Sequence, residues 1–285
     1  MGWGVGYSVH RVNIAILGLG SIGHRHARNF HALGCSVQGF DVATSPNTPL
    51  ESALDGCQAA IIATPPESHV ELAWAALSAG CHVLCEKPLS VDMAETGLLL
   101  SRFRQAGKVF AVGYPWRYDR SMNEKRRRVL EDIGPVQRWN CRYAYNTPNE
   151  TALRMGALLD CSHAIDFLRW ILGEPAGLTA AEWPDRSRST LTIRFGLASG
   201  MAYLSLRAPL ECRWEIVGAE GAVDWIRARD VDYNLNETYL AEAAHFLACC
   251  RGEAQPLTDG WDARETLRIA LAARKAAQEG RWIAR

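Results

Sequence analysis

Short apolar runs alternate with stretches of helical character between residues 11 and 113, and this alternation restricts the possible folds more than any other feature of the chain. The apolar runs are VNIAILG, SVQGF, AAIIAT, HVLCE and VFAVG, and the stretches predicted to be helical are residues 22–33, 67–79 and 91–106. Apolar runs that do not alternate in polarity are typical of strands covered on both faces, and helical crossovers make such strands parallel. The sequence therefore predicts an α/β protein that begins with a doubly wound parallel sheet.

The second half of the chain has a different pattern. The runs STLTIRF and GMAYLSLRA alternate in polarity around the turn GLASG, and RWEIVG and AVDWI stand on either side of AEG. Such pairs indicate antiparallel strands joined by short turns. We predict that residues 1–115 form the domain of the parallel sheet. Residues 116–285 are predicted to form an α+β domain on an open, mainly antiparallel sheet, with terminal helices over 237–250 and 259–279 that could pack back on the first domain.

The charge balance and the cysteines exclude several classes of protein. Lys and Arg together number 31, as do Asp and Glu, so the chain has no general attraction to nucleic acid or to an anionic membrane. The basic cluster EKRRR, residues 124–128, is therefore interpreted as the solvated face of a helix. The nine cysteines lack the C-x2-C spacing of a zinc site, so we expect no metal and reduced, apolar cysteines.

The hydropathy of the chain predicts neither export nor a membrane span. The first residues, MGWGVGYSVHR, lack the basic and apolar regions of a signal peptide, and no stretch approaches the roughly 18 apolar residues that a span needs. We expect a cytoplasmic protein.

The motif GLGSIG places three glycines, Gly18, Gly20 and Gly23, directly after the first apolar strand and directly before a helix. The first glycine permits a tight turn, the second lets the backbone approach a pyrophosphate, and the third lets the helix pack on the strand. Free N–H groups at the helix start, near Ser21 and Ile22, would then bind the phosphates. The motif predicts a Rossmann dinucleotide site; the alternative is a purely structural glycine turn.

Asp41 ends the second strand, about twenty residues into this unit. A carboxylate there can accept hydrogen bonds from both ribose hydroxyls of the adenosine half, and it would repel a 2′-phosphate. The sequence therefore favours NAD over NADP. In the alternative interpretation Asp41 only caps the turn that follows it.

The motif ATPPESH follows the third strand, and its two prolines turn the backbone out at the carboxyl edge of the sheet, where ligands bind in such folds. We expect Thr64 and Pro65 to line the cofactor and include His69, at the end of the motif, among the candidate cofactor ligands. Pro66 is equally compatible with ordinary helix initiation.

The fourth strand runs directly into CEKPL, so Glu86 and Lys87 emerge at the same sheet edge as Gly20 and Thr64, and we count both among the candidate cofactor-binding residues. Pro88 disfavours the helical region for Lys87 and holds it extended at the strand end. A lysine partly desolvated beside a nicotinamide would have a lowered pKa and could exchange a proton with a substrate oxygen. The alternative is a lysine that extends from a buried strand end to the surface.

Asp160, His163 and Asp166 recur every third residue in LLDCSHAIDFLRWIL. If the stretch is helical, they are neighbours on one flank, and an imidazole between two carboxylates is oriented to hold a proton near neutral pH. This pattern predicts a general base with two supports. A histidine that merely hydrogen-bonds at a polar helix edge is the alternative, and a metal site lacks a companion set of ligands.

These motifs together resemble the glucose–fructose oxidoreductase, inositol dehydrogenase and rhizopine-catabolism (Gfo/Idh/MocA) family. The residues that carry the resemblance are GLGSIGHRH, ATPPESH, CEKPL, VGYPWRY, GALLDCSHAIDFLRWILG and PLTDGWDARETLRIALAARKAAQEGRW, in the family's order. The resemblance implies a Rossmann domain, an α+β domain often used for homo-oligomer contacts, and nicotinamide-dependent oxidation or reduction of sugars, cyclitols or their derivatives.

The resemblance also implies roles for individual residues. His163 falls on the family's catalytic histidine, Lys87 on its EKP lysine, and Asp160 near the acidic partner. Arg117 matches an arginine that contacts substrate or braces the domain interface, and we count Arg117 and Asp166 as candidate substrate-binding residues.

The chain departs from the family's pattern at two places. Two residues rather than three separate the aspartate from the histidine, and Pro115 stands where many relatives have an asparagine. The short segment YAYNTPNETALRMG is expected to shape the substrate pocket. The leading prediction is an NAD-dependent dehydrogenase or reductase for a small sugar-like substrate; the alternative is a cofactor-binding sensor or assembly subunit that does not turn over.

Overall fold

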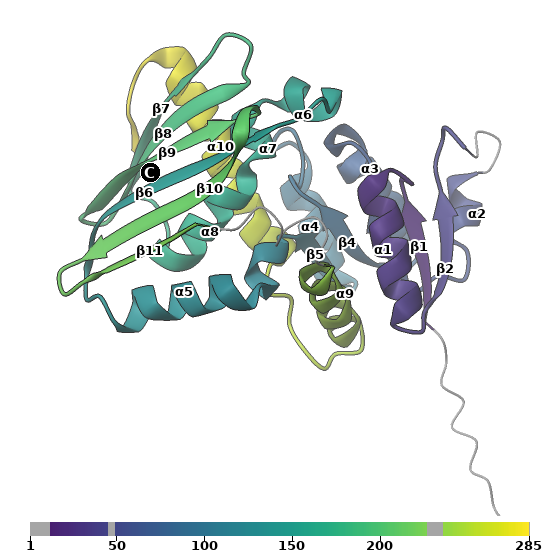
Figure 1. The fold of residues 1–285 in the computed structure, drawn as a ribbon. Helices are drawn as coiled ribbons and strands as arrows, with labels where there is room; N and C mark the ends of the chain where they lie inside the picture. Colours follow the sequence, from purple (N-terminus) through teal and green to yellow (C-terminus); the bar gives the residue numbers. More distant parts are fainter. Residues whose placement is uncertain (1–11, 45–48, 227–235, 285) are drawn as a thin grey trace, which may run out of the picture.

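The computed structural model describes residues 12–44, 49–226 and 236–284 of the chain. Its first part contains a five-stranded parallel sheet in the order β2-β1-β3-β4-β5 (Figure 1). The strands are β1 (Asn13–Leu17), β2 (Ser36–Phe40), β3 (Ala59–Ile62), β4 (His82–Glu86) and β5 (Phe110–Gly113). The order reverses at β1, as in doubly wound sheets. The predicted α/β fold and its five apolar strands are confirmed.

The helices of this part cover both faces of the parallel sheet. They are α1 (Ser21–Ala32), α2 (Leu50–Leu54), the 3₁₀ turn η1 (Pro66–Ser68), α3 (His69–Ser78) and α4 (Thr96–Gln105). The helix predicted from residue 91 begins only at Thr96. Asp92 accepts a hydrogen bond from the backbone of Ala94 at 2.7 Å, and Thr96 donates its hydroxyl to Met93 O at 2.9 Å. Such local side-chain bonds compete with helix formation over these residues.

The second sheet has seven strands in the order β11-β10-β6-β9-β8-β7-β12. The strands are β6 (Val136–Asn146), β7 (Gly177–Glu182), β8 (Arg188–Phe195), β9 (Ala198–Ser205), β10 (Arg207–Gly218), β11 (Ala222–Ile226) and β12 (Ile283–Ala284). All neighbouring pairs are antiparallel except β6 and β9, which run parallel. The mainly antiparallel sheet is confirmed, but β6, β7 and β12 were not among the predicted strands.

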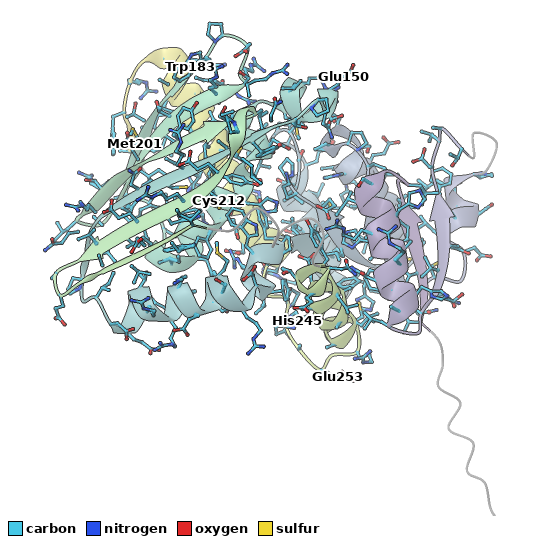
Figure 2. The ribbon with its side chains drawn as sticks, viewed as in Figure 1. Glu150, Trp183, Met201, Cys212, His245 and Glu253 are labelled. Carbon is cyan, nitrogen blue, oxygen red and sulfur yellow. The ribbon has the colours of Figure 1, made fainter. Side chains whose placement is uncertain are left out.

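One face of this second sheet is covered and the other is open. Cys212 of β10 is buried, whereas Met201 of β9 is 46% exposed on the opposite face (Figure 2). On the covered side, a cluster of aromatic rings joins the sheet to the helices, with Trp214 and Trp225 stacked at 5.8 Å and Phe167 packed 5.0 Å from Trp214. This cluster is the core of the second part.

The remaining helices connect the two sheets. They are η2 (Pro115–Tyr118), α5 (Arg120–Glu131), α6 (Glu150–Met155), α7 (Ala157–Asp160), α8 (Ser162–Leu172), α9 (Glu237–Cys250) and α10 (Gly260–Glu279). The terminal helix α9 packs against α1 and η2, and α10 packs against β7 and α8 on one side and α4 and β5 on the other (Figure 1). Both predicted terminal helices are present, and both contact the first part of the chain.

Three smaller predictions can be compared with the structure. The cluster EKRRR lies on α5, where the exposed Arg127 pairs with Glu124 at 2.9 Å and with Glu131 at 2.8 Å, as expected of a solvated helix face. The nine cysteines are free, and all but Cys250 are buried. Within the described part of the chain, no helix is long and apolar enough to cross a membrane.

Candidate active site

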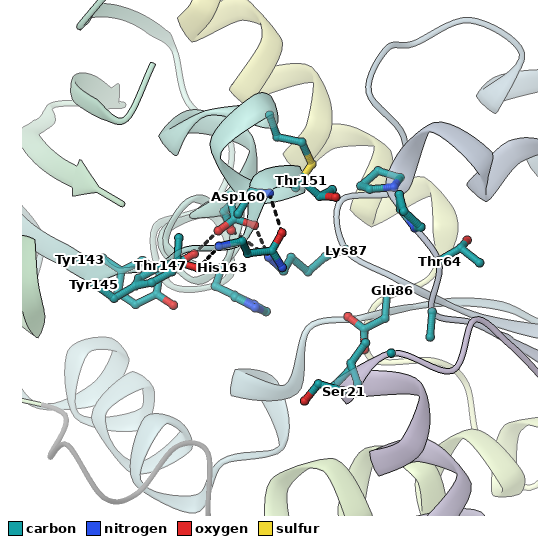
Figure 3. Close-up of a pocket in the computed structure, with 18 of the residues that line it drawn as sticks. Ser21, Thr64, Glu86, Lys87, Tyr143, Tyr145, Thr147, Thr151, Asp160 and His163 are labelled. Carbon is teal, nitrogen blue, oxygen red and sulfur yellow. Dashed lines mark hydrogen bonds and ion pairs between the residues drawn. The ribbon is translucent and has the colours of Figure 1, made fainter. Parts of the chain in front are cut away.

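A cavity of about 740 Å³ lies where the carboxyl edge of the parallel sheet faces the second sheet and its helices (Figure 3). Residues from both parts of the chain form its wall. The first part contributes Gly20, Ser21, Ile22, Ala63, Thr64, Pro65, Pro66, Glu86 and Lys87, and the second contributes Trp116, Tyr143, Tyr145, Asn146, Thr147, Asn149, Thr151, Ala152, Met155, Asp160, His163, Leu210 and Tyr239. The segment YAYNTPNETALRMG supplies much of this wall, as expected for a segment that shapes the pocket.

The glycine loop between β1 and α1 has the geometry that a dinucleotide needs. Gly18 adopts φ +95°, and a Cβ on Gly23 would lie 1.9 Å from the carbonyl oxygen of Gly18. A Cβ on Gly20, in contrast, would meet no atom within 4 Å, because this residue faces the open cavity. No side chain caps the start of α1, so its first N–H groups remain available to an anion. The loop therefore fits the pyrophosphate of a dinucleotide.

Asp41 follows β2 and is fixed by two backbone N–H groups. Leu19 donates to Oδ2 at 2.7 Å, and Ala43 donates to Oδ1 at 2.8 Å. Asp41 is thus both the cap of its own turn and a brace for the glycine loop, so the two interpretations of this residue are compatible. Each carboxylate oxygen has a second lone pair that could accept a ribose hydroxyl.

The motif after β3 divides between the cavity wall and the interior. Thr64 and Pro65 line the cavity, whereas His69 is buried behind it. The ring nitrogens of His69 lie 2.9 Å from Pro88 O and 2.9 Å from Thr64 O. Burial lowers the pKa of His69. The ring lies between the carbonyl oxygens of Pro88 and Thr64, and so between the loops that follow β4 and β3. In this position His69 supports the cofactor site instead of lining it.

Lys87 reaches across the cavity to the second part of the chain. Its Nζ donates to the carbonyl oxygen of Asp160 at 2.9 Å and lies 3.3 Å from Asp160 Oδ1 (Figure 3). Burial alone would lower the pKa of Lys87, but the carboxylates of Asp160 and Glu86 raise it above the ordinary value. The predicted lowering of this pKa is therefore wrong, because the sequence did not reveal how closely Asp160 approaches. Lys87 is a charged hydrogen-bond donor at neutral pH.

Tyr145 is a cavity residue that the sequence did not single out. It lies near the end of β6, and its hydroxyl donates to Asp160 Oδ2 (Figure 3). Burial, together with the negative charge of Asp160, raises the pKa of Tyr145 well above its usual value. One carboxylate is thus shared between the Lys87 ammonium and a neutral phenol. The alternation of Trp139, Cys141, Tyr143 and Tyr145 with polar residues was the signal for this strand and for the face that these side chains occupy.

The three residues at spacing three do not share one helix flank. The helix is interrupted at Cys161, so Asp160 ends α7 while His163 and Asp166 lie on α8. The imidazole of His163 is held by aromatic rings: Trp116 stacks on it with centroids 5.3 Å apart, and Tyr114 meets it edge-on at 5.6 Å. His163 Nδ1 is buried, so Nε2 is the ring nitrogen that can serve the cavity.

Asp166 and Arg117 form an internal ion pair outside the cavity wall. Arg117 Nη2 lies 2.6 Å from Asp166 Oδ1 and 2.6 Å from Asp262 Oδ2 of α10. Burial alone would lower the pKa of Arg117, but these two carboxylates raise it, so the guanidinium stays charged. The geometry does not support the prediction that Arg117 and Asp166 bind substrate. Of the two roles left open for Arg117, it fits the brace between η2, α8 and α10.

The fold and this cavity define a class of protein, a dinucleotide-binding enzyme with a second domain that completes the site. A model of the oxidoreductase family with an NAD-binding Rossmann fold matches residues 35–114, and a model of the same family's C-terminal α/β domain matches residues 198–284. The chain belongs to this oxidoreductase family, Gfo/Idh/MocA, and its cofactor is NAD, as the sequence predicted.

Several characterised proteins and solved structures are similar over nearly the whole chain. The scyllo-inositol 2-dehydrogenase (NAD(+)) of Bacillus subtilis (strain 168) is 24% identical over 95% of this chain and 95% of its own length. The myo-inositol 2-dehydrogenase of Thermotoga maritima is 24% identical over 95% of this chain and 98% of its own. Among solved structures, a probable dehydrogenase from Thermotoga maritima has a TM-score of 0.86 at 23% identity, covering 96% and 98% of the two chains. GenD2 from gentamicin A biosynthesis, in complex with NAD, has a TM-score of 0.86 at 21% identity, with 97% of each chain covered.

Proposed function

We propose that the protein is an NAD-dependent dehydrogenase that oxidises a secondary alcohol of a small, uncharged cyclitol or sugar. The observation that carries this proposal is the meeting of Lys87 and His163 on the wall of one cavity that also contains the glycine loop. Relatives of similar length are named as inositol dehydrogenases, which supports the choice of a polyol.

The polarity of the cavity wall supports an uncharged substrate. Away from the glycine loop the wall carries amide and hydroxyl groups, with indole and phenol rings beside them; these residues are Asn146, Asn149, Thr147, Thr151, Tyr145, Tyr143 and Trp116. The amide and hydroxyl groups can hydrogen-bond to the hydroxyls of a polyol, and the aromatic rings can pack against the C–H faces of its ring. Among the described residues that line the cavity there is no arginine, and the one lysine is already paired with a carboxylate. A phosphate or diphosphate on the substrate would find little compensating charge.

The residues divide the proton chemistry between them. The bound NAD supplies the acceptor for the hydride that leaves the substrate carbon. His163 accepts the proton of the same hydroxyl through Nε2, because the rings of Trp116 and Tyr114 hold its imidazole in place at the cavity wall. Lys87 stays charged and donates a hydrogen bond to the oxygen as negative charge develops on it. Asp160 holds the Lys87 ammonium in place.

The test is NADH formation from a panel of uncharged polyols, with myo-inositol, scyllo-inositol and glucose as first members. We expect His163→Gln to lower kcat by about 10²- to 10⁴-fold and Lys87→Met by a similar factor, because each removes a group that acts on the reacting oxygen. The matched controls are His31→Gln and Lys108→Met, both outside the cavity wall, which should retain wild-type rates. NAD⁺ binding, measured by calorimetry, should survive in all four variants.

The same experiment separates the enzyme from a cofactor-binding sensor. Tight NAD⁺ binding without NADH formation from any member of the panel would favour the sensor. Turnover that persists in His163→Gln would contradict the proposed roles.

A further inference from the structure

Glu86 is a charged group in the cavity for which the proton chemistry has no use. It ends β4, next to Lys87, and its side chain is only 12% exposed at the cavity wall (Figure 3). Its Oε1 lies 2.8 Å from Nε2 of His26, a residue of α1 whose side chain is 1% exposed. On the side of β5 the carboxylate lies close to Gly113. A Cβ added to Gly113 would be 3.4 Å from Glu86 Oε1. Glu86 is therefore held in one position at the base of the cavity.

The surroundings of His26 indicate how it binds the carboxylate of Glu86. Its Nδ1 is buried and has no hydrogen-bond partner among the described residues. A neutral ring that donates through Nε2–H leaves only a lone pair at Nδ1, whereas a charged ring would leave an unpaired N–H, which costs more when buried. His26 therefore donates to Glu86 through Nε2–H. Burial alone would raise the pKa of Glu86, but its hydrogen bond and charge interaction with His26, together with the charge of Lys87, lower it, so Glu86 carries the negative charge.

The other titratable groups around Glu86 do not cancel this charge. Burial lowers the pKa of His69 of α3, which favours its neutral form. Glu242 of α9 is also neutral, because burial raises its pKa well above the usual value. Lys87 is positive, but Asp160 already balances it at 3.3 Å. Among the described residues, the base of the cavity therefore carries one unbalanced negative charge, at Glu86.

The topology places this charge on the nicotinamide side of the site. The strand order is β2-β1-β3-β4, with Asp41 at the end of β2 for the adenosine half and the glycine loop at the end of β1 for the pyrophosphate. A dinucleotide that runs along this edge continues past Thr64 of β3 toward β4. Glu86 ends β4, between the glycine loop and the groups proposed to act on the substrate.

We propose that Glu86, held by His26, makes the site selective for the oxidised cofactor. The nicotinamide ring of NAD⁺ carries one positive charge and that of NADH carries none, so a fixed carboxylate beside the ring favours NAD⁺. After oxidation of the substrate the proton's positive charge resides on His163 and the nicotinamide ring is neutral, so the carboxylate of Glu86 no longer attracts the ring. NADH is then held less tightly, which favours its release. This inference concerns the cofactor and does not depend on the identity of the substrate.

The test is the ratio Kd(NADH)/Kd(NAD⁺), measured by calorimetry without substrate. In Glu86→Gln we expect the ratio to fall about tenfold, mostly through weaker NAD⁺ binding, because a unit charge near the ring is removed from a partly screened site. Glu86→Asp keeps the charge and should keep the ratio within about threefold. The exposed Glu71→Gln on α3 serves as the control and should leave the ratio unchanged.

A second variant and a stability measurement complete the test. His26→Leu removes the donor to Glu86 and should also lower the ratio Kd(NADH)/Kd(NAD⁺), so the inference can be tested even if Glu86→Gln does not fold. Thermal unfolding reports whether each variant is folded. Equal weakening of both cofactors in Glu86→Gln, or no change in either, would overturn the inference and leave Glu86 as an ordinary cofactor ligand. An inactive protein whose ratio still shifts would refute the proposed function but not this inference.

Discussion

Asp160 is the residue on which the geometry of the cavity converges. Its two carboxylate oxygens and its carbonyl oxygen hold Lys87, which directly follows β4, and Tyr145 of β6. The phenol hydrogen bond takes up part of the carboxylate's charge, so the attraction of Asp160 for Lys87 is moderated. We therefore propose that Tyr145 acts on the reaction through Asp160, as a positioning residue.

Tyr145→Phe tests this role. We expect kcat for polyol oxidation to fall about tenfold with little change in Kd for NAD⁺, because the undivided carboxylate holds the Lys87 ammonium away from the substrate oxygen. The measurement is steady-state kinetics at several pH values, with Tyr203→Phe on β9, outside the cavity wall, as the control. In the double variant with Lys87→Met, the effect of Tyr145→Phe should disappear. Equal effects with and without Lys87 would show that the hydroxyl acts independently of the ammonium.

The residues at the cavity wall could be predicted from the sequence where a local motif contains them. Gly20, Ser21, Ile22, Thr64, Lys87 and His163 were all found in this way, and they line the cavity. The raised pKa of Lys87 and the role of Tyr145 depend on contacts 73 and 15 residues apart in the chain, which no local pattern reveals.

At the scale of elements, a buried ion-pair network fixes α8 in the position that presents His163. Arg117 of η2 reaches Asp166 of α8 and Asp262 of α10, and Arg169 of α8 lies 3.1 Å from Asp262. Predicted elements were correct where periodicity was strong, as for β1, β8 and α9. The break at Cys161 and the late start of α4 were missed, because local hydrogen bonds and tertiary contacts override the helical pattern there.

Arg117→Met is expected to destabilise the protein because it leaves Asp166, which is 1% exposed, without its bidentate partner. Removing one partner of a buried ion pair costs about 3–5 kcal/mol in the free energy of unfolding. Urea denaturation measures this loss. The control is Arg127→Met on the exposed face of α5, where solvent screens the ion pairs and the free energy of unfolding should change little. A loss for Arg117→Met no larger than that of the control would show that the network does not brace α8.

At the scale of the whole molecule, the active-site cavity exists because the two sheets face each other across it. The terminal helices make this arrangement possible, since α9 returns to α1 and α10 packs against elements of both parts. Lys87 at the end of β4 thereby meets Asp160 of α7, and His163 lies on the helix that follows. The homo-oligomer predicted through the second sheet stays a prediction, and so does the cytoplasmic location.

The most direct measurement is a crystal structure of the wild-type protein with NADH and myo-inositol, a combination that cannot react. We predict that one hydroxyl oxygen of the inositol lies within about 2.6–3.2 Å of both Lys87 Nζ and His163 Nε2, with its carbon facing the nicotinamide ring. An inositol hydroxyl bound to Lys87 while His163 lies beyond hydrogen-bond distance, or an inositol seated away from both, would contradict the account.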